Sequence, residues 1–467
     1  MKKLFILITA LLIISINGCD NNSCYYWAKT YGGGSIDSAR SIQQTTDGGY
    51  IVAGYTNNFV ESCYENTWVI KLTKDGSVEW EKAYHEVHEP YTDYPIYDYS
   101  RAYDIKQTTD SGYILVGEAM KQRYCSPVTV IDYDILVIKL DENGDVSWQE
   151  TFRDGCNTAR SVDQTTEGGY IVAGYSYAEC YEIYSPDESR IWVMKLDSDG
   201  EITWQKQYYF QGENGEAHSI KNTTDGGYIV AGQKISQTHN RDAWVLKLDV
   251  SGDVTWQKTY GGSDNESIYS IQQTEDDGFI MAGYTYSFGT GKADAWVLKL
   301  DENGEITWQK SYGDESGDYA CSIQHTEDGG YIVSGQTSYF YYEYSKPDIW
   351  VLKLNREGDI EWQKKYGGIT AWSIQQIEYR GYIVAGEFGT ASGDFYVVKL
   401  DKRGNIPGCD IIEETSATVS DTDVIGQDTD CKFKSTSFSA YEPELTAQDT
   451  SAEVNTLCSG EKTFIRK

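Results

Sequence analysis

A segment of about fifty residues recurs seven times along the chain, and this repeat constrains the fold more than any other feature. Each unit opens at a tryptophan, and successive tryptophans lie 52 to 68 residues apart. The seven are Trp27, Trp80, Trp148, Trp204, Trp256, Trp308 and Trp362. Repeats of this length are typical of solenoids and propellers, in which each repeat forms one structural unit that packs against its neighbours.

Each unit contains four short segments rich in β-branched and aromatic residues. In chain order they read SIQQT, YIVAGY, WVLKL and ITWQKTY, or close relatives. Asp-Gly-Gly joins the first two segments, and Asp-Glu-Asn-Gly or a relative joins the last two. Glycine supplies the positive φ that such tight hairpins need, and no segment has a sustained helical period. The sequence therefore predicts four antiparallel strands per unit and almost no helix.

Seven such sheets favour an all-β, seven-bladed β-propeller over residues 27–408. A linear solenoid is the alternative, but it needs capping repeats, which the sequence lacks. The chain enters the repeat at a fourth strand, residues 27–31, and leaves it after a third strand, residues 397–400. We expect the N-terminal strand to complete the last blade. That closure would bring Cys24 and Cys409 to one end of blade seven, so the two are candidates for a disulfide. Free thiols and pairings within the tail are the alternatives.

The loops between strands two and three, and between blades, lie on one face of a propeller. In this chain they vary in length, whereas the other loops are short and uniform. The segments 85–100, 177–190 and 338–348 are acidic and rich in tyrosine. Tyrosine is common in binding surfaces, and loops on a rigid scaffold often carry function. This face is the predicted binding face, and solvated loops without a ligand are the alternative.

A second variable position lies at the start of each first strand, between two neighbours that barely change. First strands line the axial channel, and this end faces the variable loops. Two arginines there can hold an anionic group such as a carboxylate. The predicted ligand-binding residues are Arg40, Tyr103, Arg160, His218, Tyr269 and Trp372. The alternative is that these side chains fill gaps between blades.

The N-terminus has the pattern of an export signal. Two lysines precede an apolar stretch, residues 4–16, that is short for a membrane span. The sequence Ile-Asn-Gly-Cys at 16–19 resembles the lipobox of bacterial lipoproteins. This resemblance implies a signal peptide over residues 1–18, acylation of Cys19 and a lipidated linker over residues 19–26. We therefore expect a membrane partner through acyl chains, on the cell membrane or the outer membrane, outside the cytoplasm.

Two further resemblances concern the repeat itself. The pattern Asp301-x-x-Gly304-x-x-x-Trp308 resembles the tryptophan-docking motif of quinoprotein propellers, in which the Trp stacks between blades. Over residues 27–408, DGGYIVAG followed by WVLKLDxxGxxxWQKTYGG resembles exported bacterial and archaeal repeat proteins. The resemblance implies the fold and an extracytoplasmic location but no activity. The cofactor-binding residues of quinoproteins are not recognisable, so we expect no cofactor.

Composition and motifs exclude several classes of function. A net charge of −33 argues against a nucleic-acid partner, which needs clustered lysine and arginine. His85 and His88 lack HExxH spacing, the acidic hairpins lack the downstream glutamate of an EF-hand, and we expect no metal site. Residues 409–467 are rich in Ser, Thr, Asp and Glu, and we expect a poorly ordered tail without strand repeats.

These observations predict a lipid-anchored envelope protein that acts as a non-enzymatic binding module. Its ligand would be a glycan or an envelope protein, held on the variable face. A scaffold in envelope assembly and an enzyme that acts on extracellular glycans are the alternative functions. Two buried carboxylates with raised pKa values at the channel mouth would favour the enzyme.

Overall fold

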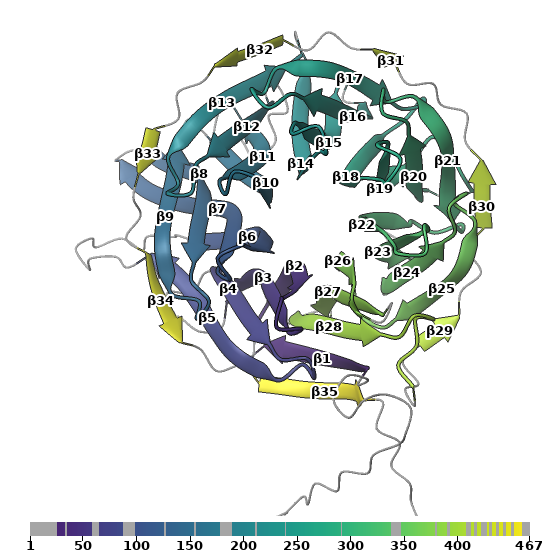
Figure 1. The fold of residues 1–467 in the computed structure, drawn as a ribbon, viewed down its shortest axis with the longest axis horizontal. Coiled ribbons are helices and arrows are strands. Elements are labelled where there is room, and N and C mark those ends of the chain that lie inside the picture. Colours follow the sequence, from purple (N-terminus) through teal and green to yellow (C-terminus); the bar gives the residue numbers. More distant parts are fainter. Residues whose placement is uncertain are drawn as a thin grey trace, which may run out of the picture.

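The computed structural model describes residues 26–32, 35–57, 65–86, 99–125, 128–153, 156–177, 189–210, 213–238, 240–290, 292–337, 347–378, 381–389 and 393–407, and seven short segments between 412 and 459. Seven sheets surround an axial opening, with the first strand of each sheet innermost (Figure 1). The predicted seven-bladed β-propeller is confirmed. Among the described residues, no helix is long and apolar enough to cross a membrane.

The repeat supplies four antiparallel strands to each blade, and the first six blades follow chain order. Blade 1 contains β2 (Asp37–Gln44), β3 (Tyr50–Thr56), β4 (Asn66–Leu72) and β5 (Val78–Glu86). Blade 2 contains β6 (Tyr99–Gln107), β7 (Tyr113–Cys125), β8 (Val128–Leu140) and β9 (Val146–Arg153). Blade 3 contains β10 (Cys156–Gln164), β11 (Tyr170–Tyr177), β12 (Arg190–Leu196) and β13 (Ile202–Tyr209).

The same order continues around the ring. Blade 4 contains β14 (Asn214–Asn222), β15 (Tyr228–Ile235), β16 (Arg241–Leu248) and β17 (Val254–Tyr260). Blade 5 contains β18 (Glu266–Gln273), β19 (Phe279–Thr285), β20 (Asp294–Leu300) and β21 (Ile306–Gly313). Blade 6 contains β22 (Tyr319–His325), β23 (Tyr331–Thr337), β24 (Asp348–Leu354) and β25 (Ile360–Tyr366).

Blade 7 is built from both ends of the repeat, which closes the ring. It contains β26 (Ala371–Gln376), β27 (Tyr382–Phe388), β28 (Asp394–Leu400) and the N-terminal strand β1 (Trp27–Gly32). β1 pairs with β28 in antiparallel register, from Trp27 opposite Lys399 to Tyr31 opposite Phe395. The predicted closure by the N-terminal strand is therefore confirmed. Cys24 and Cys409, the proposed disulfide, lie outside the described residues.

The C-terminal tail adds a fifth strand to every blade. Its strands run back around the outside of the ring, from blade 6 through blade 1 to blade 7 (Figure 1). They are β29 (Ile412–Glu414), β30 (Thr418–Asp421), β31 (Gln427–Asp428), β32 (Lys432–Ser435), β33 (Ser439–Tyr441), β34 (Leu445–Asp449) and β35 (Glu453–Ser459). The expectation of a tail without strands is corrected for these segments. Each fourth strand has an open edge of N–H and C=O groups, and a short segment can pair with it through its backbone alone.

Apolar side chains of adjacent blades fill the space between them, so each sheet is apolar on both faces. Between blades 4 and 5, for example, Ile229 and Val245 pack in one cluster with Met281 and Trp296. Trp256 of blade 4 reaches across to the hairpin of blade 5, where Gly304 has φ +77° and a Cβ would lie 2.8 Å from the indole ring. Only glycine allows this approach.

A tyrosine at the end of the fourth strand holds the same hairpin of the next blade. Tyr260 Oη donates a hydrogen bond of 2.6 Å to Gly304 O. Five other tyrosines make the equivalent bond at 2.6 to 2.8 Å. They are Tyr31, Tyr84, Tyr208, Tyr312 and Tyr366. In blade 2 the residue is Phe152, which has no hydroxyl.

A buried lysine on the third strand anchors the first hairpin of its own blade. In blades 1 to 6 its Nζ lies 2.6 to 3.1 Å from an acidic side chain of that hairpin. In blade 7 the sequence of the repeat has Tyr379 in place of the acid, and Lys399 Nζ donates to Lys74 O at 3.0 Å. Burial, and then the charge of Lys74, lower the pKa of Lys399 to about 8. In the blades that have the acidic side chain, that side chain stabilises the charged form of the lysine.

Replacing Asp225 by asparagine tests this pairing through pH. Lys247 Nζ lies 2.7 Å from Asp225 Oδ2, and the pKa of Asp225 falls to about 2 because hydrogen bonds from Lys247 and Thr223 outweigh burial. Since the folded-state pKa is depressed, the stabilisation is complete above about pH 4 and is lost as pH falls towards 2. Asp225 is 61% exposed, so we expect the substitution to lower the free energy of unfolding by only about 1 kcal/mol at pH 7.

Urea denaturation of both proteins between pH 2 and 7 measures the effect. The difference between parent and Asp225→Asn should be largest at pH 7 and should shrink below about pH 4. A difference that stays constant over this range would contradict the ion-pair account.

Candidate functional site

The first strand of every blade contains a β-bulge at the variable position identified in the sequence. In blade 1, Ala39 pairs with Gly54 and Ser41 pairs with Ala53, so Arg40 has no partner across the strand. The same register shift occurs in the other six blades. A bulge re-aims the side chain of the extra residue. Seven bulges at one level therefore direct seven variable side chains towards the axis.

These side chains line a cavity of about 560 Å³ at the channel mouth, the mouth cavity. The structure brings together all six residues predicted from the sequence, together with Cys321 of blade 6. The ring consists of Arg40, Tyr103, Arg160, His218, Tyr269, Cys321 and Trp372. That these residues bind a ligand remains a prediction.

Arg40 is clamped between two aromatic rings. Its guanidinium lies 4.1 Å from the centroid of Trp372 and 5.4 Å from that of Tyr55. One terminal nitrogen donates to Tyr55 Oη at 3.0 Å and lies 3.5 Å from Glu387 Oε1. Its Nε is buried without a hydrogen-bond partner among the described residues. The rings thus hold a cation whose donors are only partly satisfied.

Arg160 has the same arrangement in blade 3. Its guanidinium lies 4.1 Å from the centroid of Tyr103 and 5.3 Å from that of Tyr175, and it donates to Tyr175 Oη at 2.6 Å. Stacking on aromatic faces is a favourable environment for a guanidinium. The two arginines therefore present fixed positive charge to the mouth cavity.

The acidic side chains near the cavity are engaged by neighbours. Glu216 accepts hydrogen bonds from Gln233 at 2.7 Å and from Tyr177 at 3.2 Å. Burial acts to raise the pKa of Glu216, but the contact with His218 and the charge of Arg160 outweigh it and lower this pKa. A general acid for glycoside hydrolysis needs the opposite shift.

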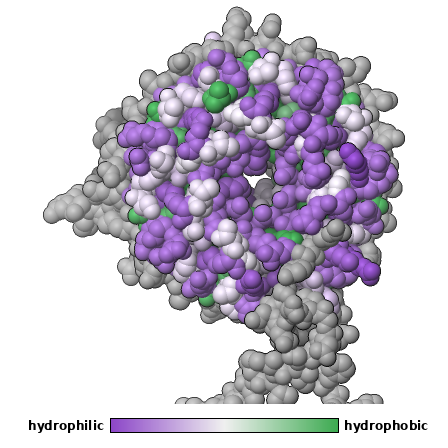
Figure 2. Space-filling model, viewed as in Figure 1, coloured by the Kyte–Doolittle hydropathy of each residue, from purple (hydrophilic) through white to green (hydrophobic). Residues whose placement is uncertain are grey.

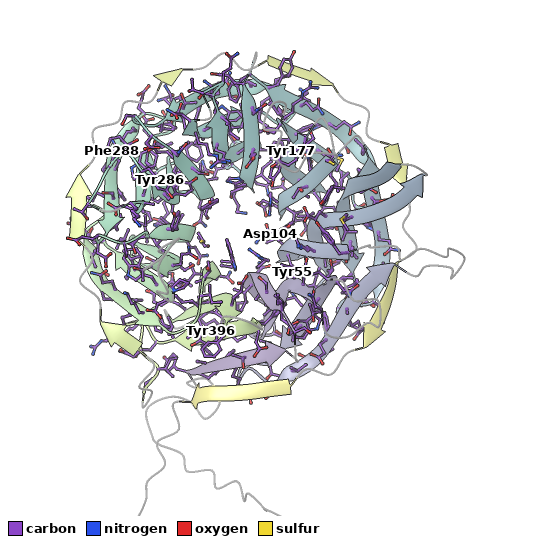
Figure 3. The ribbon with its side chains drawn as sticks, turned by 180° about the vertical axis from the view of Figure 1, so that it is seen from behind. Tyr55, Asp104, Tyr177, Tyr286, Phe288 and Tyr396 are labelled. Atoms are coloured by element: carbon purple, nitrogen blue, oxygen red, sulfur yellow. The ribbon has the colours of Figure 1, made fainter. Side chains whose placement is uncertain are left out.

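Aromatic side chains form the other side of the mouth cavity. His218 stacks at 5.2 Å on Tyr269, Tyr269 lies 5.7 Å from Tyr284, and Tyr284 lies 5.2 Å from Tyr319. Outside this arc, Tyr286 is 42% exposed and its hydroxyl lies 2.7 Å from that of Tyr319. Figure 3 shows Tyr55, Tyr177 and Tyr286 spread around the axial opening, with Asp104 at its edge.

Two cysteines in the described part of the chain have defined states. Cys321 in the ring is free, and burial raises the pKa of its thiol to about 12, so the thiol is protonated at neutral pH. Cys156 is disulfide-bonded. Among the described residues, no group of three or more His, Cys, Asp or Glu side chains is placed to hold a metal ion.

Several other residues predicted from the sequence fall mainly outside the described residues. They are the acylation site Cys19 and most of the acidic, tyrosine-rich segments 85–100, 177–190 and 338–348. The sequence reasoning also missed a ring of partners on the second strands, directly after the Ala-Gly, Val-Gly or Ser-Gly pair. These are Tyr55, Glu118, Tyr175, Gln233, Tyr284, Gln336 and Glu387. Their variation within an otherwise constant YIVAG segment is a signal that could have found them.

Comparison with known proteins names no function for this chain. No family model and no curated protein matches the chain. Among solved structures, a protein of unknown function from Dyadobacter fermentans is 10% identical, with 80% of this chain and 98% of that chain covered and a TM-score of 0.42. Sqt1 from Chaetomium thermophilum is 11% identical, with 80% and 89% covered and a TM-score of 0.38.

The fold and the site together define the class of protein. The chain is a seven-bladed β-propeller whose variable side chains converge at one end of the axial channel. Figure 2 shows that the hydrophilic surface continues around the axial opening.

Proposed function

We propose that this protein is a non-enzymatic binding module that recognises a glycan in the mouth cavity. The observation that carries the proposal is the convergence of seven bulged, variable side chains on one cavity with aromatic walls. Aromatic faces bind the apolar faces of sugar rings, and the remaining donors of Arg40 and Arg160 can bind hydroxyl or acidic groups. The lowered pKa of Glu216 favours binding over glycoside hydrolysis.

The sequence supports a location for this activity. The lipobox-like segment favours a lipid anchor at Cys19 on the outward side of an envelope membrane, with the propeller exposed to extracellular glycans. The net charge of −33 argues against a nucleic-acid ligand, whose phosphates would be repelled.

A glycan array with the purified chain and an Arg40→Ala/Arg160→Ala variant tests the proposal. We expect saturable binding to the parent and a loss of about 100-fold in the variant, because two central arginines are removed. An Arg356→Ala/Arg403→Ala variant has the same change in charge on exposed hairpins at the opposite face and should bind like the parent.

The outcomes separate two positions for the site and a different class of ligand. Binding that survives the Arg40→Ala/Arg160→Ala change would move the site outwards to the variable loops. Absence of binding to any glycan by the folded parent would overturn the glycan proposal and favour a protein partner.

A further inference from the structure

The channel below the mouth cavity contains a layer of hydrogen bonds that link each blade to the next. In five blades, one side chain of the first strand accepts a hydrogen bond from a backbone N–H of the following blade, at 2.5 to 3.1 Å. The acceptors are Gln43, Asp163, Gln272, Gln324 and Gln375. These bonds hold the inner edges of the blades together.

Blades 2 and 4 have lysines at this position. Lys106 and Lys221 occupy the place of the acceptor. An ammonium group has no lone pair, so neither lysine can accept the hydrogen bond from the next blade. Blades 2 and 4 therefore lack this hydrogen bond to the next blade, and each places a cationic side chain in the channel. A structural role alone would be served better by glutamine, as in four of the other blades.

The two lysines differ in how their charge is balanced. Lys106 Nζ lies 2.9 Å from Asp104 Oδ1. Lys221 has no hydrogen bond or ion pair from its Nζ among the described residues. Burial lowers the pKa of Lys221, and the charge of Lys106 lowers it further. Asp104 and Asp163 act in the opposite direction, and no described residue takes up the hydrogen-bond donors of Lys221 Nζ.

The lysines belong to the same axial cavity as the ring above them. The inner part of the channel, the inner channel, has a volume of about 350 Å³, and all seven ring residues line it as well as the mouth cavity. The inner channel is lined by four cations and two carboxylates, which give it a net charge of +2 with His218 neutral. They are Arg40, Lys106, Arg160, Lys221, Asp104 and Asp163. This is a positive site within a protein of net charge −33.

We propose that the ligand of the mouth cavity carries a carboxylate and that this group binds in the inner channel at Lys221, beside Lys106. The inference rests on the proposed function, and it names the class of ligand: an acidic sugar such as a uronic acid. Lys106 Nζ is paired with Asp104, whereas Lys221 Nζ has no hydrogen-bond partner among the described residues. A ligand carboxylate can accept a charge-assisted hydrogen bond from this free ammonium group.

Lys221→Gln is the variant that tests the proposal with least damage to the fold. It introduces the residue that Gln43, Gln272, Gln324 and Gln375 represent in other blades, and it restores an acceptor for the next blade. Its melting temperature should equal or exceed that of the parent. Lys310→Gln is the matched control, because Lys310 pairs with Asp359 in an outer hairpin far from the axis.

Calorimetric titrations compare galacturonate and glucuronate oligosaccharides with their methyl esters, which have the same backbone without the charge. We expect the parent and Lys310→Gln to bind at least one acid about tenfold or more tighter than its ester, as for a charge-assisted hydrogen bond. In Lys221→Gln this preference should disappear, while binding of the ester stays as in the parent.

The failures of the two proposals give different results. Equal binding of acid and ester by the parent would overturn the carboxylate site and leave glycan recognition intact. A preference for the acid that persists in Lys221→Gln would also overturn it, because the charge would then be recognised elsewhere. If the parent binds neither acid nor ester while the glycan array is negative, both proposals fail.

Discussion

Replacement of Gly283 by alanine is expected to destabilise the protein by about 3 kcal/mol or more. Gly283 belongs to the YIVAG segment type and lies opposite the bulge in the first strand of blade 5, where it pairs with Ile268. A Cβ at this position would lie 1.8 Å from Ser267 O and 2.9 Å from Ile268 Cα. Both are backbone atoms, so no side-chain rotation relieves the clash. Either the bulge or the strand pairing must give way.

Urea denaturation measures this effect, and Gly226→Ala is its control. Gly226 has φ +82°, and no atom lies within 4 Å of the position that a Cβ would take, so alanine there adds backbone strain without a clash. We expect about 1 kcal/mol for this control. Equal losses in the two variants would contradict the view that the glycine exists to accommodate the bulge, and with it the explanation of how the ring side chains are aimed.

Replacement of Asp104 by serine is expected to cost about 3 kcal/mol, although serine is the residue at this position in the other six blades. Asp104 is 8% exposed. It accepts hydrogen bonds from Ser41 at 2.9 Å and from Val162 N at 3.1 Å, and it pairs with Lys106. Serine can serve the backbone donor, but it leaves the ammonium of Lys106 without its carboxylate.

A double-mutant cycle separates these contributions. The double variant Asp104→Ser/Lys106→Gln gives blade 2 the Ser and Gln pair of blades 1, 5, 6 and 7. Its free energy of unfolding should be less than about 1 kcal/mol below that of the parent. The coupling energy is obtained from the denaturation midpoints of the four proteins. If the double variant is as unstable as Asp104→Ser, the cost arises from the lost hydrogen bonds of the carboxylate to neighbouring blades, and the ion pair contributes little.

The repeat made the fold predictable because its signals are local. Each hairpin glycine, each apolar segment and each Trp lies within one unit of about fifty residues, and seven copies of the same signal reinforce one another. The incomplete units at the two ends predicted the pairing of β1 with β28. The variable position between constant neighbours, as in Ala39-Arg40-Ser41, predicted which side chains gather at the mouth cavity.

The seven short strands of the tail were not predicted, because their pairing depends on partners elsewhere in the chain. Segments as short as Gln427–Asp428 have no apolar alternation of their own, and their pairing comes from the open edge of a strand such as β17. Such an edge offers backbone donors and acceptors to any extended segment that reaches it. Composition alone indicated disorder, and only the closed ring places seven edges along the path of the tail.

By itself the sequence determined the number of blades, the strands within them, the closure of the ring and the residues that face the axis, since all of these follow from a local pattern repeated in register. Only the tertiary structure decided which groups surround those residues. The clamp of Tyr55 and Trp372 around Arg40, and the approach of Lys221 to Lys106, join residues of different blades. Distances between such residues are set by packing across the ring, which no single repeat encodes.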